Sequence, residues 1–265
     1  MPEDCYHQWS WDIGKSWEYG RDSALTAAAN VAIVPDFESA RLSSPAFLDA
    51  FFQSPTEQSQ LNSFTNSIYT HTSSTTFQPS ETHVWMDRLA QQGRLMRHYT
   101  QNIDRIEYFL PSLDSKTVRL HGRVDRARCA RCNWTCDIEP TAFQSKAMGC
   151  EGPCLSRQQA RELQGKRSIG VGLLRPDVLL YGGMNPAEEE IFTCLEEDIR
   201  RRPDLVIVVG TRLLIPSARD LAKGLCDRTL ETGGKTVWVN KSPKSCGLNF
   251  SLVWQGDCDD FAALD

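Results

Sequence analysis

The clearest hydrophobic pattern lies in the last quarter of the chain. A continuous apolar run, LVIVV at 205–209, precedes a helical pattern over 218–231, and a Gly-Gly turn leads into the run KTVWVN at 235–240. A last short run, SLVWQG, lies at 251–256. Apolar strands that alternate with helices are typical of a parallel sheet covered on both faces. The pattern therefore predicts an α/β fold.

The middle of the chain is less regular. Apolar residues return at helical spacing over 82–97, and KTVRLHG at 116–122 has the alternation of a strand. Between 53 and 82 the chain is rich in Ser, Thr and Gln and has few apolar anchors. Such a composition favours a surface loop or a mobile insertion that packs intermittently.

Charged residues group along the stretch 188–202. Acidic side chains come first and Arg200 to Arg202 come last, which is the order that the helix dipole favours. We expect a solvated helix here.

Composition indicates a folded protein. The chain has 265 residues, of which 40% are hydrophobic, with seven Trp and eleven Phe, enough to build a core. The N-terminus lacks the pattern of a secretory signal, and the longest apolar run is too short to span a bilayer. These features predict an intracellular location.

The net charge of -5 does not favour direct binding to nucleic-acid phosphates. An association with chromatin would therefore be indirect. The basic stretch RVDRARCAR at 123–131 could contact nucleic acid or an acidic partner. A structural role is the alternative.

Two closely spaced cysteine pairs point to a metal. Cys129 and Cys132 lie in CARC, and Cys150 and Cys154 lie in CEGPC. Two thiolate pairs separated by a short ribbon suit tetrahedral zinc, and four protein ligands leave it no open position for catalysis. Unmetallated thiols or a redox pair are the alternative, and Cys136 is a spare candidate ligand.

Further short motifs accompany the cysteines in a fixed order. They are YTQNID at 99–104, LHG at 120–122, RPD at 175–177, Gly210 and Thr211, Asn240, and GDC at 256–258. In this order the chain resembles the sirtuins, the NAD-dependent protein-lysine deacetylases, and most of all the fungal nuclear branch that deacetylates histones. The resemblance implies a Rossmann-like parallel sheet domain with an inserted small zinc-ribbon and helical domain. The expected division is an atypical segment 1–23, a first part of the NAD domain 24–125 with the insertion 53–82, a zinc module 126–167, and a second part of the NAD domain 168–265.

The resemblance also implies roles for single residues. His121 would take a proton from the ribose hydroxyls after nicotinamide leaves, a task that suits imidazole because its pKa lies near neutral pH. Val178, Leu179 and Tyr181 would pair with an acetyl-lysine peptide. The residues expected to surround NAD are Asp36, Phe37, Gln101, Asn102, Asp104, Gly210, Thr211, Asn240, Asp257 and Cys258. Without the resemblance, His121 would rather be a structural residue at a strand end, and 101–104 a polar turn.

The stretch ALTAAANVAIVPDFES at 24–39 departs from the family pattern. Aligned on Pro35, Asp36 and Phe37, it places alanines where the family has a glycine-rich loop, and Glu38 where it has arginine. Glycines there let the backbone approach pyrophosphate, so their loss should weaken NAD binding. Two hypotheses follow: a nuclear NAD-dependent deacetylase of acetylated histones or other acetyl-lysine proteins, and an impaired relative that only binds acetyl-lysine or chromatin partners.

Overall fold

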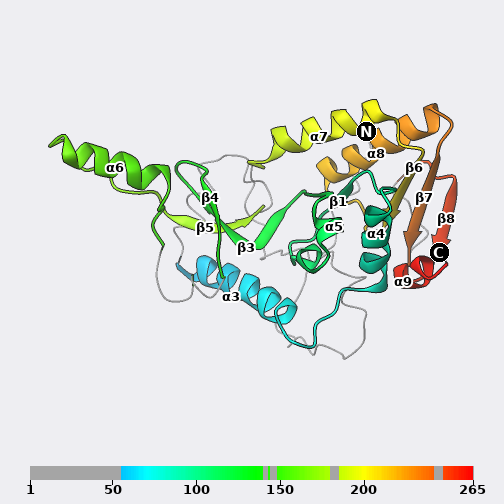
Figure 1. Ribbon diagram of the computed structural model, residues 1–265, viewed down its shortest axis with the longest axis horizontal. Helices are drawn as coiled ribbons and strands as arrows, with labels where there is room; N and C mark the ends of the chain where they lie inside the picture. Colours follow the sequence, from blue (N-terminus) through cyan, green and yellow to red (C-terminus); the bar gives the residue numbers. More distant parts are fainter. Residues whose placement is uncertain (1–54, 140–142, 144–147, 180–184, 242–246, 265) are drawn as a thin grey trace, which may run out of the picture.

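The computed structural model describes residues 55–139, 143, 148–179, 185–241 and 247–264. Figure 1 shows an elongated molecule, with a body of parallel strands and helices at one end and a smaller sheet with a projecting helix at the other. Asp36, Phe37, Tyr181 and the stretch 24–39 lie outside the described residues.

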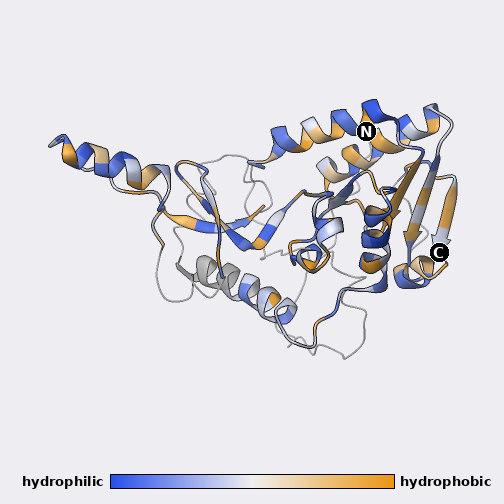
Figure 2. Ribbon diagram, in the orientation of Figure 1, coloured by the Kyte–Doolittle hydropathy of each residue, from blue (hydrophilic) through white to orange (hydrophobic). Residues whose placement is uncertain are grey.

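The body contains a parallel sheet in the order β6-β7-β8, which spans Leu205–Val209, Lys235–Asn240 and Leu252–Gln255. Side chains of the central strand β7 alternate between two apolar clusters. Trp238 packs with Ala222 and Cys226 of helix α8 (Pro216–Glu231). Val237 and Val239 pack on the other face with Cys258, which begins helix α9 (Cys258–Ala262). A helix thus packs on each face of the sheet, and Figure 2 shows apolar residues along its strands.

A second parallel pair, β1 (His98–Thr100) and β2 (Thr117–Arg119), lies beside this sheet. It joins the body through an apolar cluster in which Tyr99 and Leu120 pack with residues of α8 and of helix α7 (Glu188–Arg201). Helix α4 (Glu81–Gln91) precedes β1, and the short helices η1 (Ile106–Phe109) and α5 (Pro111–Asp114) connect β1 to β2.

The smaller sheet has the order β4-β3-β5 and is antiparallel. Its strands span Thr135–Asp137, Gly122–Cys129 and Leu174–Val178, and helix α6 (Pro153–Leu163) projects from it. The apolar cluster of this module has six buried members among the described residues: Ala127, Phe143, Leu174 and the cysteines Cys129, Cys150 and Cys154. A module with so small a core needs a further source of stability.

Two expectations need correction. The Ser/Thr-rich stretch within 53–82 is not a loop, since helix α3 spans Pro55–Thr72, and Thr65 on it is fully buried. Helix α7 is not solvated on all sides, because Asp198 is completely buried. Leu195 and Ile191, one and two turns before it on the helix, pack against the apolar cluster of α8. In both cases the structure depends on tertiary contacts, which local composition does not reveal.

Among the described residues, no helix is long and apolar enough to cross a membrane.

Candidate functional site

Polar residues gather where the parallel strands end. Gln101 follows β1, Thr211 follows β6, and Asn240 ends β7. The Gln101 amide nitrogen donates to the Thr211 hydroxyl (2.9 Å), and the Asn240 amide nitrogen donates to the Thr211 carbonyl (2.6 Å). The carboxyl edge of an open parallel sheet is where such folds bind their ligands.

Gly210 allows this arrangement. Its φ of 66° lies in the left-handed region, which costs glycine little, and its N–H donates to the Val239 carbonyl at 3.0 Å. The chain therefore turns sharply after β6 and presents Thr211 to Gln101 and Asn240.

Asp257 and Cys258 lie at the same edge of the sheet. Asp257 caps α9 by accepting from the Asp259 N–H (3.1 Å), and Lys241 lies 3.1 Å away; these contacts hold the pKa of Asp257 below its usual value. Burial raises the pKa of Cys258 to about 11, so its thiol stays neutral. At neutral pH Asp257 is therefore a carboxylate and Cys258 a neutral thiol.

His121 stands in the link between β2 and β3. Its Nδ1 lies 3.0 Å from the Gln101 carbonyl oxygen. A carbonyl can only accept, so Nδ1 carries the proton and Nε2 is left as the basic nitrogen. Burial lowers the pKa of His121, which keeps the imidazole neutral and able to take a proton.

The end of β5 runs alongside this histidine. Leu179 N–H donates to the His121 carbonyl at 2.9 Å, and Val178 pairs with Gly122. Gly122 has φ 81°, and a Cβ there would collide with the Asp177 carbonyl oxygen. Only glycine allows β3 and β5 to approach so closely beside His121.

Asn102 and Asp104 complete the motif. The Asn102 N–H donates to the Thr100 hydroxyl at 3.1 Å, and the Ile106 N–H donates to Asp104 at 3.3 Å. Burial, together with the charge of Glu107, raises the pKa of Asp104 to about 7. Near neutral pH this carboxyl is therefore partly protonated and can donate a hydrogen bond as well as accept one.

The four cysteines of the two pairs meet as the sequence predicts. Their Sγ atoms all lie within 4.8 Å of one another. The Cys129–Cys154 and Cys132–Cys150 separations are 3.8 and 3.7 Å, and zinc bonded at about 2.3 Å to four sulfurs would place them about 3.8 Å apart. The cluster fits a structural zinc ion. Cys136 packs against the same core but is not one of the four.

An anchor that the sequence analysis missed holds β1 in place. The Asp198 carboxylate accepts from Arg97 Nε and Nη2, both at 2.9 Å, and from the Tyr99 hydroxyl at 2.8 Å. The hydrogen bond to Asp198 raises the pKa of Arg97, and burial raises that of Tyr99. The apolar spacing of Ile191 and Leu195 on α7 was the signal that could have placed Asp198 on the buried side.

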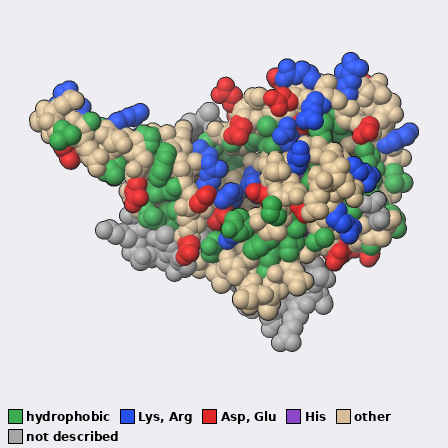
Figure 3. All heavy atoms as spheres, viewed as in Figure 1, with side chains coloured by type: hydrophobic (Ala, Val, Ile, Leu, Met, Phe, Trp, Pro, Cys, Tyr) green, Lys and Arg blue, Asp and Glu red, His purple; other side chains and the backbone are tan. Residues whose placement is uncertain are grey.

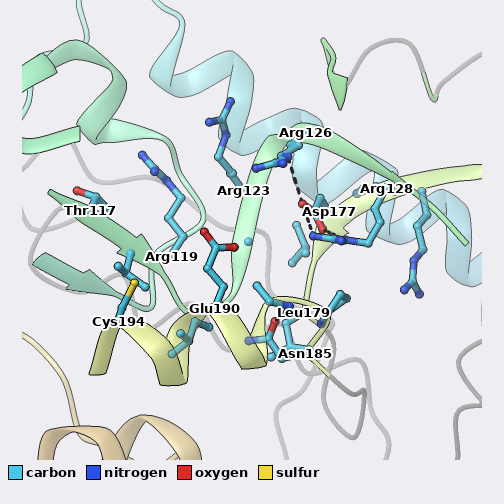
Figure 4. Close-up of a pocket in the computed structure, with 18 residues that line it drawn as sticks. Thr117, Arg119, Arg123, Arg126, Arg128, Asp177, Leu179, Asn185, Glu190 and Cys194 are labelled. Atoms are coloured by element: carbon cyan, nitrogen blue, oxygen red, sulfur yellow. Dashed lines mark hydrogen bonds and ion pairs between the residues drawn. The ribbon is translucent and has the colours of Figure 1, made fainter. Parts of the chain in front are cut away.

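A second feature is a pocket of about 210 Å³ between β3, β5 and α7, which is lined by several arginines. Figure 4 shows that Arg126 and Arg128 both point toward Asp177. Three of them, Arg123, Arg126 and Arg128, belong to the basic stretch at 123–131, but the pocket and the position of Arg175 beside Arg128 depend on the pairing of β3 with β5.

Comparison with known proteins gives one consistent family. The Sir2 family model matches residues 34–217. The NAD-dependent protein deacetylase hst4 of Emericella nidulans is 37% identical over 203 residues, which are 70% of this chain and 34% of that protein. The protein of the same name from Schizosaccharomyces pombe is 32% identical over 200 residues, which are 71% of this chain and 48% of that protein. The chain thus spans between a third and a half of the length of these relatives.

Solved structures show the same fold. A structure of Sir2Tm bound to a propionylated peptide has a TM-score of 0.59 at 24% identity and covers 87% of this chain and 84% of that one. A Sir2 complex with p53 peptide and NAD+ has a TM-score of 0.58 at 24% identity, with 87% and 85% covered. The parallel sheet, the four-cysteine module and the match over 34–217 agree. The chain belongs to the Sir2 family.

Proposed function

We propose that the protein is an NAD-dependent lysine deacetylase that acts on acetylated histones or other acetyl-lysine proteins in the nucleus. The observation that carries the proposal is the geometry of His121. Its Nδ1–H is held by the Gln101 carbonyl, its Nε2 is left basic, and burial keeps it neutral. The names of the relatives, NAD-dependent protein or histone deacetylases, support it.

NAD would supply an activated ribose carbon that accepts the acetyl oxygen as nicotinamide leaves. The residues assigned to hold it are those at the carboxyl edge of the sheet, where Gln101 and Asn240 both donate to Thr211. Amide and hydroxyl groups both donate and accept, which suits ribose hydroxyls. Asp104, with its pKa of about 7, would meet the nicotinamide carboxamide as acceptor or donor.

His121 would act as the general base. A neutral imidazole whose Nδ1 is fixed can take a proton from a ribose hydroxyl at Nε2, which makes that oxygen nucleophilic. The acetylated lysine would lie along Val178 and Leu179, because Leu179 is bonded directly to the His121 backbone. Main-chain pairing of this kind recognises an extended peptide with little demand on its sequence.

Turnover on an acetylated histone peptide tests this proposal. The wild-type protein should form deacetylated peptide and nicotinamide only when both NAD and the acetylated peptide are present. His121→Ala should lower formation of deacetylated peptide by roughly a hundredfold or more, which is the usual contribution of a general base. The control His71→Ala removes an exposed imidazole on α3 and should leave the rate unchanged. Equal rates for the two variants would refute the assigned role.

The second candidate is a module that binds acetyl-lysine or a chromatin partner without turnover. It is favoured by Ala27, Ala28 and Ala29, which stand where the family has its glycine-rich loop. Titration of NAD by calorimetry separates the two: no heat of binding at millimolar cofactor, with acetyl-peptide binding retained, would select the binding module.

A further inference from the structure

The arginine-lined pocket lies next to the proposed peptide site and has no part in the proposed chemistry. It is bounded by β3 and β5 on one side and by the start of α7 on the other. In the space-filling view, Lys and Arg side chains gather around a hollow near the middle of the face (Figure 3). The arginines that line the pocket are Arg119, Arg123, Arg126, Arg128 and Arg175.

Three of these arginines share one face of the smaller sheet. Arg126 and Arg128 are two residues apart on β3, so they point to the same side, and Arg175 is the cross-strand partner of Arg128. Like charges directly opposite each other destabilise a sheet. Negative charge placed on this face would therefore reduce the repulsion between the arginine side chains.

The acidic side chains that line the pocket supply only part of this negative charge. Arg128 Nε lies 2.6 Å from Asp177, and Arg126 Nε lies 3.6 Å from the same carboxylate. The Arg126 side chain is 40% exposed, whereas that of Arg128 is 14% exposed. Two guanidinium groups thus converge on a single carboxylate, and the more exposed one makes the looser contact. Glu190 of α7 is the other carboxylate among the residues that line the pocket.

Arg119 and Arg123 have carboxylate partners of their own. Arg119 Nη2 lies 2.5 Å from Asp114, and Arg123 Nε lies 2.6 Å from Asp125. The excess positive charge is consequently concentrated at Arg126 and Arg128, which share the single carboxylate of Asp177. Guanidinium groups bind carboxylates and phosphates through paired hydrogen bonds, which makes a compact anion the matching ligand.

We propose that this pocket binds an acidic or phosphorylated side chain of the acetylated protein, close in sequence to the acetyl-lysine. The proposal rests on the proposed function, since the pocket also borders Val178 and Leu179, where the acetylated peptide would lie. A volume of about 210 Å³ suits a single anionic group better than a nucleic-acid duplex. The net charge of -5 also disfavours binding of a polyanion.

Peptide binding to the full chain, measured by fluorescence anisotropy without NAD, tests the proposal. The probes are acetyl-lysine peptides that differ only in one residue, which is serine, glutamate or phosphoserine at each position in turn around the lysine. At least one position should bind roughly tenfold more tightly with phosphoserine or glutamate than with serine, because hydrogen bonds between charged groups contribute at least that much. A larger gain for phosphoserine identifies phosphate as the preferred ligand, and an equal gain identifies any acidic side chain.

Arg126→Gln should abolish this preference and leave the affinity for the serine peptide unchanged, because Arg128 still pairs with Asp177. Arg200→Gln is the matched control, since Arg200 is exposed on α7 and does not line the pocket. If Arg126→Gln proves unfolded by circular dichroism, Arg175→Gln serves the same purpose. The preference should also weaken as salt is added.

Three results would overturn the proposal: no position with a preference, a preference that survives both pocket substitutions, or a pocket-dependent affinity for a short DNA duplex in place of the peptides. Loss of turnover with the peptide preference intact would instead contradict the proposed enzyme and leave the pocket in place.

Discussion

The buried carboxylate of Asp198 offers a quantitative test of how β1 is held. Asp198→Asn keeps the shape of the side chain but replaces an oxygen that accepts by a nitrogen that donates. Three donors point at this group, two from Arg97 and one from Tyr99. The asparagine can accept from at most part of them, so the Arg97 guanidinium loses its buried carboxylate partner and keeps only the longer contact with Glu197.

Removing one partner of a buried ion pair costs about 3–5 kcal/mol. The three hydrogen bonds share one carboxylate, so their individual values are not added. Asp198 has no exposed side-chain surface, and Arg97 has 19%, which places the pair within the range for buried pairs. For a protein of this size each kcal/mol shifts Tm by about 2–4 °C, so we expect a decrease in Tm of roughly 6–20 °C.

The neighbouring residue supplies the control. Glu197 lies 3.7 Å from the same Arg97, but its side chain is 53% exposed. Exposed pairs contribute about 0–1 kcal/mol, so Glu197→Gln should change Tm by a few degrees at most. Calorimetric unfolding of both variants checks the reasoning. A decrease for Asp198→Asn no larger than for Glu197→Gln would refute the view that burial gives this pair its value.

Three further predictions concern the rest of the molecule. Chelation of zinc, or Cys154→Ala, should unfold the β4-β3-β5 module, because half of the buried residues in its apolar cluster are cysteines. Metal analysis and hydrogen exchange check this, and a protected module without metal would contradict it. Gly122→Ala should cost about 2 kcal/mol or more, because its Cβ would meet the Asp177 carbonyl. Gly93→Ala, with similar φ but no atom within 4 Å, should cost less, and equal urea midpoints would refute the contact argument. The free energy of unfolding should fall as pH drops from about 6.5 to about 4. Burial lowers the pKa of His83 and His98 to about 4 in the folded protein, so in this range the unfolded chain binds more protons than the folded one. A urea midpoint that stays constant over this range would contradict the prediction.

The pH effect has an opposing contribution. Asp104 has a pKa raised to about 7, so the folded protein holds a proton that the unfolded chain releases near its ordinary value. The contribution of Asp104 to the free energy of unfolding falls as pH rises toward 7, whereas the contribution of the two histidines rises. Because two groups outweigh one, the net slope is toward greater stability at neutral pH. Asp104→Asn should steepen the dependence.

The last quarter of the chain could be predicted almost element by element. The runs at 205–209 and 235–240 are the strands β6 and β7, because buried parallel strands have continuous apolar sequences that no helix of that length would need. The cysteine quartet was predictable for a different reason, since zinc demands a ligand spacing that chance rarely supplies. The expected divisions between the domains stay a prediction.

Features that depend on contacts between distant segments could not be predicted. The helix α3 has a polar sequence whose order comes from packing, as buried Thr65 shows. Asp198 looked like one more surface charge until its partners, a hundred positions earlier in the chain, were known. The Arg128–Arg175 pairing likewise depends on the register of β3 with β5. Local periodicity carries no information on such contacts between distant residues.

Strand β3 connects two sites with different chemical roles, the four-cysteine cluster and His121. At one end Cys129 enters the metal cluster, and at the other Gly122 follows His121 directly. Hydrogen bonds to β4 and β5 run along the strand, with a bulge between Arg123 and Ala127. Segments tied together in this way open as one cooperative unit. Loss of the metal is therefore expected to loosen the backbone next to His121, and the amides of β3 that pair with β4 and β5 would lose their protection together.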